Sequence, residues 1–304
     1  MLLFTILTSI ILPIFIIIGI GWALDRAFRL DLPTLSKLNF YVFVPALMFV
    51  MLLRDDLDLG QVARISLFTI AHLALLFAVA WSVFLHRGLR PKQTVMTLGV
   101  VLNNCGNYGI PLVMLAFKGR TAETAVGALV IIIMIQNLFT FTAGVWMMER
   151  QARGAGSVLK NMAKIPVVYV IILALLMRWQ GWHLPEPLMA PVNHLADGLI
   201  AIALLTLGVQ LSRARLTRAL APVATVTGMR LFLAPLLAAA LLPFFHFDNS
   251  IAAVMIVAAG FPVAVNLTIL AAEYKQDEDL AAQSIFISTL LSALTLTVIL
   301  ALVR

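Results

Sequence analysis

Long apolar segments separated by short polar ones run along the whole chain. Ten of them are long and apolar enough to predict membrane-spanning helices, since about 20 helical residues cross a bilayer core. They are residues 2–24, 34–53, 62–85, 94–117, 123–148, 164–181, 191–212, 219–244, 250–272 and 282–303. The first exceeds a signal-peptide core and lacks a clear cleavage site, so we interpret it as a retained helix. The pattern predicts an all-α polytopic membrane protein with ten transmembrane helices.

Composition supports this class and excludes others. Hydrophobic residues make up 62% of the chain and charged residues 12%, whereas soluble domains average about 25% charged residues. The net charge of +7 comes from Lys and Arg in short loops, so we predict contact with membrane lipid and no nucleic-acid binding. With Cys105 as the one cysteine, an intramolecular disulfide and a multi-cysteine metal site are excluded. We predict no cofactor and no metal site.

Loop charge predicts the orientation of the spans. Most Lys and Arg residues fall in the odd-numbered loops, for example Arg26, Lys92, Arg150 and Arg213. Short loops rich in Lys and Arg lie on the cytoplasmic side. Both termini are therefore predicted to be extracytoplasmic.

The longest predicted loop divides the chain into two halves. Residues 151–163 contain Gly154 and Gly156 and are interpreted as a cytoplasmic linker. Residues 1–150 and 164–304 then carry five spans each. An odd number of spans makes the second half enter from the opposite face, so the halves are predicted to be inverted repeats.

The fourth span of each half contains residues that interrupt a helix. In the first half they are Asn103, Asn104, Gly106, Asn107, Gly109 and Pro111, and in the second half Gly260, Phe261, Pro262 and Asn266. Pro removes a backbone donor and Gly allows the chain to unwind. Lipid cannot satisfy the freed backbone groups, so such segments are buried in protein or line a cavity. Paired interruptions at corresponding places in two halves predict a transport site.

The chemistry of these breaks favours an anionic cargo. A half-helix that starts after a break presents free N–H groups and partial positive charge, which suits a carboxylate. Neither break contains Asp, Glu, Lys, Arg or His, which argues against a cation as the main cargo. We predict substrate binding by Asn103, Asn104, Gly106, Asn107, Gly260, Phe261, Pro262 and Asn266, with helix breaks at Gly109, Pro111 and Pro262.

Four other polar residues within spans are secondary candidates, each with a structural alternative. Arg230 is a counter-charge for an anion or a side chain that reaches towards the cytoplasmic interface. His72 is a helix–helix contact or a proton relay. Asn137 and Tyr41 complete the cavity or pack between helices.

Two motifs resemble a known family. The run NNCGNYGIPLV resembles the fourth-helix signature of the auxin efflux carrier family, and GFPVAVNLTILAAEY its ninth-helix signature. VPALMF, within Leu38–Phe49, and LTLGVQL, within Leu204–Leu211, are similar to its second and seventh helices. The family includes plant PIN-type carriers and bacterial carriers for malate or malonate.

The resemblance implies a fold related to sodium–proton antiporters and bile-acid transporters. Helices 1, 2, 6 and 7 would form a scaffold, and helices 3–5 and 8–10 a transport domain that moves like an elevator. Broken helices 4 and 9 would cross and bind a carboxylate, with Asn104, Pro111 and Pro262 matching the family's crossover residues. A homodimer in a bacterial inner (plasma) membrane is expected.

Two departures from the plant carriers bear on the substrate. Asn103 stands where those carriers have Pro, and the linker between the halves is short. A small organic acid is therefore a better prediction than an auxin-like acid. Two alternatives stay open: a transporter of the same fold coupled to Na⁺ or H⁺, and an intramembrane enzyme. The latter needs a nucleophile–base pair, which neither His72 nor Cys105 supplies in the sequence pattern; we predict no enzyme.

Overall fold

The computed structural model describes residues 2–54, 58–85, 89, 92–148, 166–214 and 220–303. Across these residues it contains helices and one isolated antiparallel β-bridge, with no strand. The all-α prediction is confirmed. The predicted linker at 151–163 lies outside the described residues.

Seven helices among the described residues are long and apolar enough to cross a membrane. They are Leu2–Phe28, Leu32–Leu53, Gly60–Phe84, Thr121–Met148, Glu186–Ser212, Leu220–Phe244 and Glu278–Val303. Each overlaps one of the predicted spans. The fifth of these begins at Glu186, before the predicted start at residue 191, because Pro is tolerated in the first turn and Pro191 is accommodated inside the helix.

Three predicted spans have a different form. The segment predicted at 164–181 is α11, Pro166–Gln180. The segment predicted at 94–117 divides into α6 (Gln93–Val101), η4 (Cys105–Gly109) and α7 (Ile110–Ala116). The segment predicted at 250–272 divides into α15 (Asn249–Ala259) and α16 (Asn266–Glu273). Non-helical backbone interrupts both segments, at residues 102–104 and 260–265, and the second interruption contains Pro262 as predicted. Gly109 and Pro111, also predicted as break positions, instead lie inside the helical run Cys105–Ala116, where Pro111 takes one of the first two positions of α7 and its missing N–H is tolerated.

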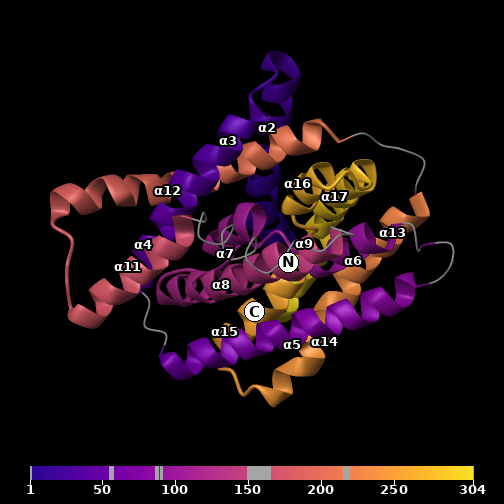
Figure 1. The fold of residues 1–304 in the computed structure, drawn as a ribbon. Helices are drawn as coiled ribbons and strands as arrows, with labels where there is room; N and C mark the ends of the chain where they lie inside the picture. The colour runs from indigo at the N-terminus through magenta and orange to yellow at the C-terminus, as the bar shows by residue number, and fades with distance from the viewer. Residues whose placement is uncertain are drawn as a thin grey trace.

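One group of helices packs around α12, Glu186–Ser212, which lies along α2 and contacts α4 (Figure 1). The other members are α1 (Leu2–Ile6), η1 (Leu7–Ile11), α2 (Leu12–Phe28), α3 (Leu32–Leu38), η2 (Asn39–Phe43), α4 (Val44–Arg54) and α11. Glycines set the α2–α12 distance: a Cβ at Gly208 would lie 2.1 Å from the carbonyl oxygen of Ile18, and one at Gly21 2.3 Å from that of Leu205. The backbones are too close for any side chain at either position.

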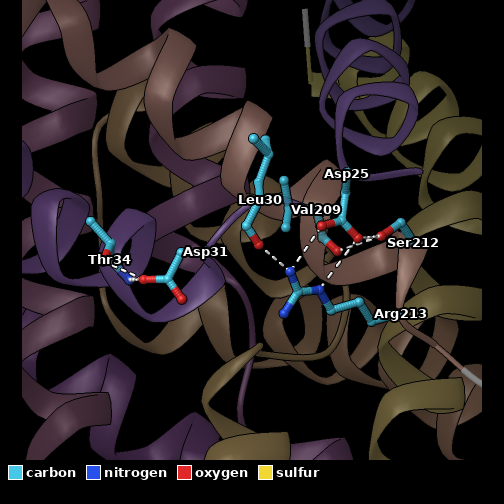
Figure 2. A network of polar contacts seen from close by, with 7 residues as sticks. All are labelled: Asp25, Leu30, Asp31, Thr34, Val209, Ser212 and Arg213. Carbon is cyan, nitrogen blue, oxygen red and sulfur yellow. Dashed lines mark hydrogen bonds and ion pairs between the residues drawn. The ribbon is translucent and has the colours of Figure 1, made fainter. Parts of the chain in front are cut away.

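A polar network fastens the same two helices at one end (Figure 2). The carboxylate of Asp25 accepts from Nη2 of Arg213 at 2.8 Å and from Nε at 3.3 Å, and Ser212 Oγ also donates to it. Arg213 Nη2 donates further to the carbonyl oxygen of Leu30. The hydrogen bond and charge of Asp25 hold the pKa of Arg213 above its ordinary value. The network ties the end of α2 to the end of α12.

The second group surrounds the broken helices. Its long members include α5 (Leu59–Phe84), which contacts α6 and α8, and α17 (Glu278–Val303), which contacts α13, α15 and α16. The rest are α8 (Arg120–Phe139), η5 (Thr140–Gly144), α9 (Val145–Met148), α13 (Leu220–Gly228), η6 (Met229–Leu233), α14 (Ala234–Leu241) and η7 (Leu242–Phe244). Figure 1 shows α7, α8 and α9 near the middle of the molecule, between α12 and α5.

Candidate functional site

The two helix breaks meet at the isolated β-bridge between Asn103 and Val263. The backbone N–H of Asn104 donates to the carbonyl of Pro262 at 2.9 Å, and that of Ala264 donates to Leu102 at 3.0 Å. Ser288 Oγ accepts from the N–H of Val263 at 3.1 Å. Backbone groups that unwinding would leave unsatisfied in lipid are thus paired between the two halves of the chain.

Close packing of Gly109 on Phe261 sets the distance between the breaks. A Cβ at Gly109 would lie 2.4 Å from Cε2 of Phe261, whose ring is fully buried. The ring also makes an edge contact with Tyr108, at 6.3 Å between centroids, and Ser292 Oγ donates to the Tyr108 hydroxyl. Gly109 and Phe261, both predicted as site residues, therefore pack the crossing together.

The side chain of Asn103 is fully engaged in holding the crossing. Its Nδ2 donates to the carbonyl of Ala258 at 3.2 Å, and its Oδ1 accepts from the thiol of Cys105 at 2.6 Å. The side-chain amide of Gln136 forms a reciprocal pair with the Asn103 backbone, donating at 2.6 Å and accepting at 3.3 Å. Asn103 consequently has a structural role beside the site.

A cavity of about 340 Å³ lies against the crossing. Of the predicted site residues, Asn103, Asn104, Gly106, Asn107 and Asn266 line it, together with the secondary candidates Asn137 and Tyr41. The remaining predicted residues do not line it: Gly109, Pro111, Gly260, Phe261, Pro262, Arg230 and His72. The structure thus separates predicted residues that face the cavity from predicted residues that lie outside its lining.

Asn104 has a buried side-chain donor at the cavity that is not used within the described part of the chain. It is 5% exposed, precedes the first residue of η4, and its Nδ2 has no hydrogen-bond partner among the described residues. Asn107 differs because its Oδ1 accepts from Nδ2 of Asn39 at 2.7 Å. At Gly106 an added Cβ would meet nothing within 4 Å, so the backbone of η4 is open to the cavity there.

The charge around the cavity is positive. Its described lining residues include Lys37, an exposed side chain in the last turn of α3, and no Asp or Glu. The helix η4–α7 begins at the cavity with Cys105, and α16 begins there with Asn266. Helix N-termini carry partial positive charge, so they and Lys37 favour a bound anion.

Sequence reasoning missed Gln210, which lines the cavity from α12. Its Oε1 is buried without a partner in the described part of the chain, as is Oδ1 of the lining residue Asn39. Gln210 stands between the apolar stretch Leu207-Gly208-Val209 and Leu211, and an isolated amide in such surroundings is the signal that identifies it. Ser36 and Thr140 are further lining residues that the sequence did not indicate.

Two buried basic residues lie away from the cavity lining. A ring nitrogen of His72, Nε2, is 2.9 Å from the carbonyl oxygen of Ala234, which is a contact between α5 and α14. Arg230 is fully buried and bonds to backbone carbonyls at the ends of α6 and α15. Among the described residues, neither His72 nor Cys105, whose thiol faces Asn103, forms a nucleophile–base pair.

Comparison with known proteins gives matches along the whole chain. A family model described as membrane transport protein matches residues 6–157 and 153–300. An uncharacterized transporter of Methanothermobacter thermautotrophicus is 26% identical over 95% of this chain and 96% of its own length. A Rhizobium meliloti protein named “Putative malonate transporter” is 25% identical over 98% of this chain and 96% of its own length.

Proposed function

The chain belongs to the membrane transport protein family, and on this premise we propose that it is a secondary transporter of a small organic anion. The family agrees with the resemblance found in the sequence. Together with the seven apolar helices of membrane-spanning length in the described part of the chain, it indicates an integral membrane protein. In this proposal the carboxylate of the substrate binds at the crossing of the two breaks.

The unpartnered Nδ2 of Asn104 is the observation that carries the proposal. A buried donor without a partner costs about 1–3 kcal/mol. A carboxylate at the start of η4 would accept from this amide and would lie at the positive end of the helix. The absence of Asp and Glu from the described lining residues removes the repulsion that such an anion would otherwise meet.

The cavity volume favours a small acid. At about 340 Å³ it stands at the lower end of the usual range for ligand pockets, about 300–1,000 Å³. A mono- or dicarboxylate of a few carbon atoms fits this volume. The name of the Rhizobium meliloti relative makes malonate the first ligand to test.

We further propose an elevator movement between the two groups of helices. The contacts of α12 with α2 and α4, and of α11 with α4, support a scaffold of helices 1, 2, 6 and 7. The contacts of α5 with α6 and α8, and of α17 with α13 and α16, support a separate transport unit. In this proposal the chain forms ten helices arranged as two inverted repeats. Two copies form a homodimer in a bacterial inner membrane, with both termini on the extracytoplasmic side.

A sodium-coupled carrier is the second candidate. Oδ1 of Asn39 and Oε1 of Gln210 are buried amide oxygens at the cavity without partners in the described residues. Hard cations such as Na⁺ prefer oxygen ligands of this kind. Coupling would place an ion between the scaffold residues and the crossing, next to the substrate.

Binding measurements on the purified protein test both candidates. We expect malonate and acetate to raise the midpoint of thermal unfolding, and malonamide and acetamide to leave it unchanged. The Asn104→Ala variant should lose about tenfold or more in malonate affinity, equivalent to about 1.4 kcal/mol, while Asn249→Ala, an exposed control, should not. Equal stabilisation by malonate and malonamide would reject the anion site. Repeating the malonate titration with choline in place of Na⁺ distinguishes the second candidate from the first. Only a sodium-coupled carrier loses malonate affinity when Na⁺ is absent.

A further inference from the structure

Arg230 is a fully buried cation without an acidic partner. It lies in η6, the π-helical turn between α13 and α14, and its side chain is 0% exposed. In the part of the chain that the structure describes, no Asp or Glu forms an ion pair with it, and its Nε has no hydrogen-bond partner. A buried charge is costly unless it is compensated, so the position of Arg230 requires an explanation.

The guanidinium group binds the ends of both broken helices. Its Nη1 donates to the carbonyl of Val100 at 2.6 Å and to that of Val101 at 3.3 Å, in the last turn of α6. Its Nη2 donates to the carbonyl of Ala259, the last residue of α15. C-terminal carbonyls carry partial negative charge. Arg230 therefore stabilises two converging helix ends and holds them at one point.

The same guanidinium stands behind the cavity. The carbonyls of Val100 and Val101 that it binds directly precede the break that borders the cavity, and His72 contacts the carbonyl of Ala234, four residues after Arg230. Asn103 connects the two sides, since its Nδ2 donates to the carbonyl of Ala258, beside the Ala259 carbonyl that Arg230 binds. Carbonyl dipoles offset part of a full positive charge, and screening is weak in the protein interior.

We infer that Arg230 is the charge that makes the cavity select anions over neutral analogues, acting through the crossing without touching the ligand. The inference rests on the proposed function, because it assumes a carboxylate at the crossing. It assigns Arg230 as a positioning and selectivity residue. In a purely structural role, Arg230 would be needed only for the hydrogen bonds of its guanidinium group. Removing its charge would then leave the preference of the cavity for anions over neutral analogues unchanged.

The ratio of malonate affinity to malonamide affinity distinguishes these roles. In Arg230→Gln, which keeps donors and loses the charge, we expect the ratio to fall about tenfold or more. In Arg230→Lys, which keeps the charge, it should stay within about threefold of the unsubstituted protein. An unchanged ratio in folded Arg230→Gln, or an equal fall in both variants, would overturn the inference.

A second pair of variants leaves Arg230 in place and decides the question if Arg230→Gln does not fold. His72→Glu puts a carboxylate near the guanidinium and should lower the ratio, whereas the neutral control His72→Gln should not. Equal ratios in His72→Glu and His72→Gln would overturn the inference. If the unsubstituted protein itself does not prefer malonate to malonamide, the proposed function fails instead, so the two failures are distinguishable.

Discussion

The backbone N–H of Asn104 donates to the carbonyl oxygen of Pro262 at 2.9 Å, and this bond joins the two halves of the chain where both helices are unwound. The bond fixes the backbone of Asn104, while its side-chain Nδ2, beside the cavity, has no partner among the described residues. Pro262 contributes a carbonyl group and does not line the cavity. One residue of the pair is thus available for a ligand, and the other positions it.

The contact between Gly109 and Phe261 predicts a stability effect. Gly109→Ala places a Cβ 2.4 Å from a fully buried ring, and overpacking of this kind costs about 1–3 kcal/mol. We expect a lower midpoint of thermal unfolding. Gly106→Ala is the matched control, since a Cβ there meets nothing within 4 Å. Recovery of the midpoint in Gly109→Ala combined with Phe261→Leu would confirm the contact, and equal midpoints for the two single variants would contradict it.

The Asp25–Arg213 network predicts coupled effects at the joined ends of α2 and α12. Arg213→Gln leaves the carboxylate of Asp25, which is 7% exposed, without its cation. Hydrogen bonds to charged groups contribute about 1.5–3 kcal/mol, so we expect a clear fall in thermal stability. Arg178→Gln, an exposed cation at the end of α11, is the control. Adding Asp25→Asn should recover part of the loss, and fully additive losses would show that the two side chains are not coupled.

The ion pair of Asp277 with Lys92 predicts a dependence of stability on acid pH. Partial burial opposes ionisation of Asp277, but the hydrogen bond and charge of Lys92 and the N–H of Leu280 outweigh it and lower the pKa below its ordinary value of 3.8. A carboxylate with a lowered pKa stabilises the fold above its unfolded pKa. This stabilisation is lost as pH falls through the folded pKa.

This contribution to stability is measured by thermal unfolding of Asp277→Asn and of the unsubstituted protein. Both are followed from pH 6 to pH 3, a range of ~3 pH units. Because Lys92 is 37% exposed, we expect a difference of at most about 1 kcal/mol at pH 6 that decreases with added salt. The two curves should converge below the ordinary pKa of Asp. A constant difference across the whole range would contradict the assignment.

The single cysteine of the chain gives a direct probe of the cavity. Cys105 is 1% exposed and lines the cavity, so a small neutral thiol reagent must enter the cavity to reach it. We expect slow labelling, followed by intact mass, that saturating malonate slows further. Cys105→Ser should give no labelled product. A labelling rate that malonate does not change would place the ligand elsewhere.

Much of the fold could be predicted because lipid constrains the sequence strongly. Apolar runs long enough to span a bilayer mark the helices, and the Asn, Gly and Pro residues from Asn103 to Pro111 and from Gly260 to Asn266 mark both breaks. Pro262 marks the second break through its own backbone chemistry. The first break lies at residues 102–104, a few residues before the Gly and Pro that drew attention to this segment, so its exact place did not follow from the sequence.

The sequence by itself thus determined that the protein is helical, that two of its helices are broken and that the breaks are uncharged. Only the tertiary structure decided which polar groups are free. Asn103 and Asn107 are engaged by Cys105, Gln136 and Asn39, while Asn104 is not. Arg230 bonds to helix ends, and Gln210 faces the cavity. The reason is that most hydrogen-bond partners come from parts of the chain that are distant in sequence and meet only in the folded protein. A helix interruption, by contrast, depends on residues close to it in the sequence.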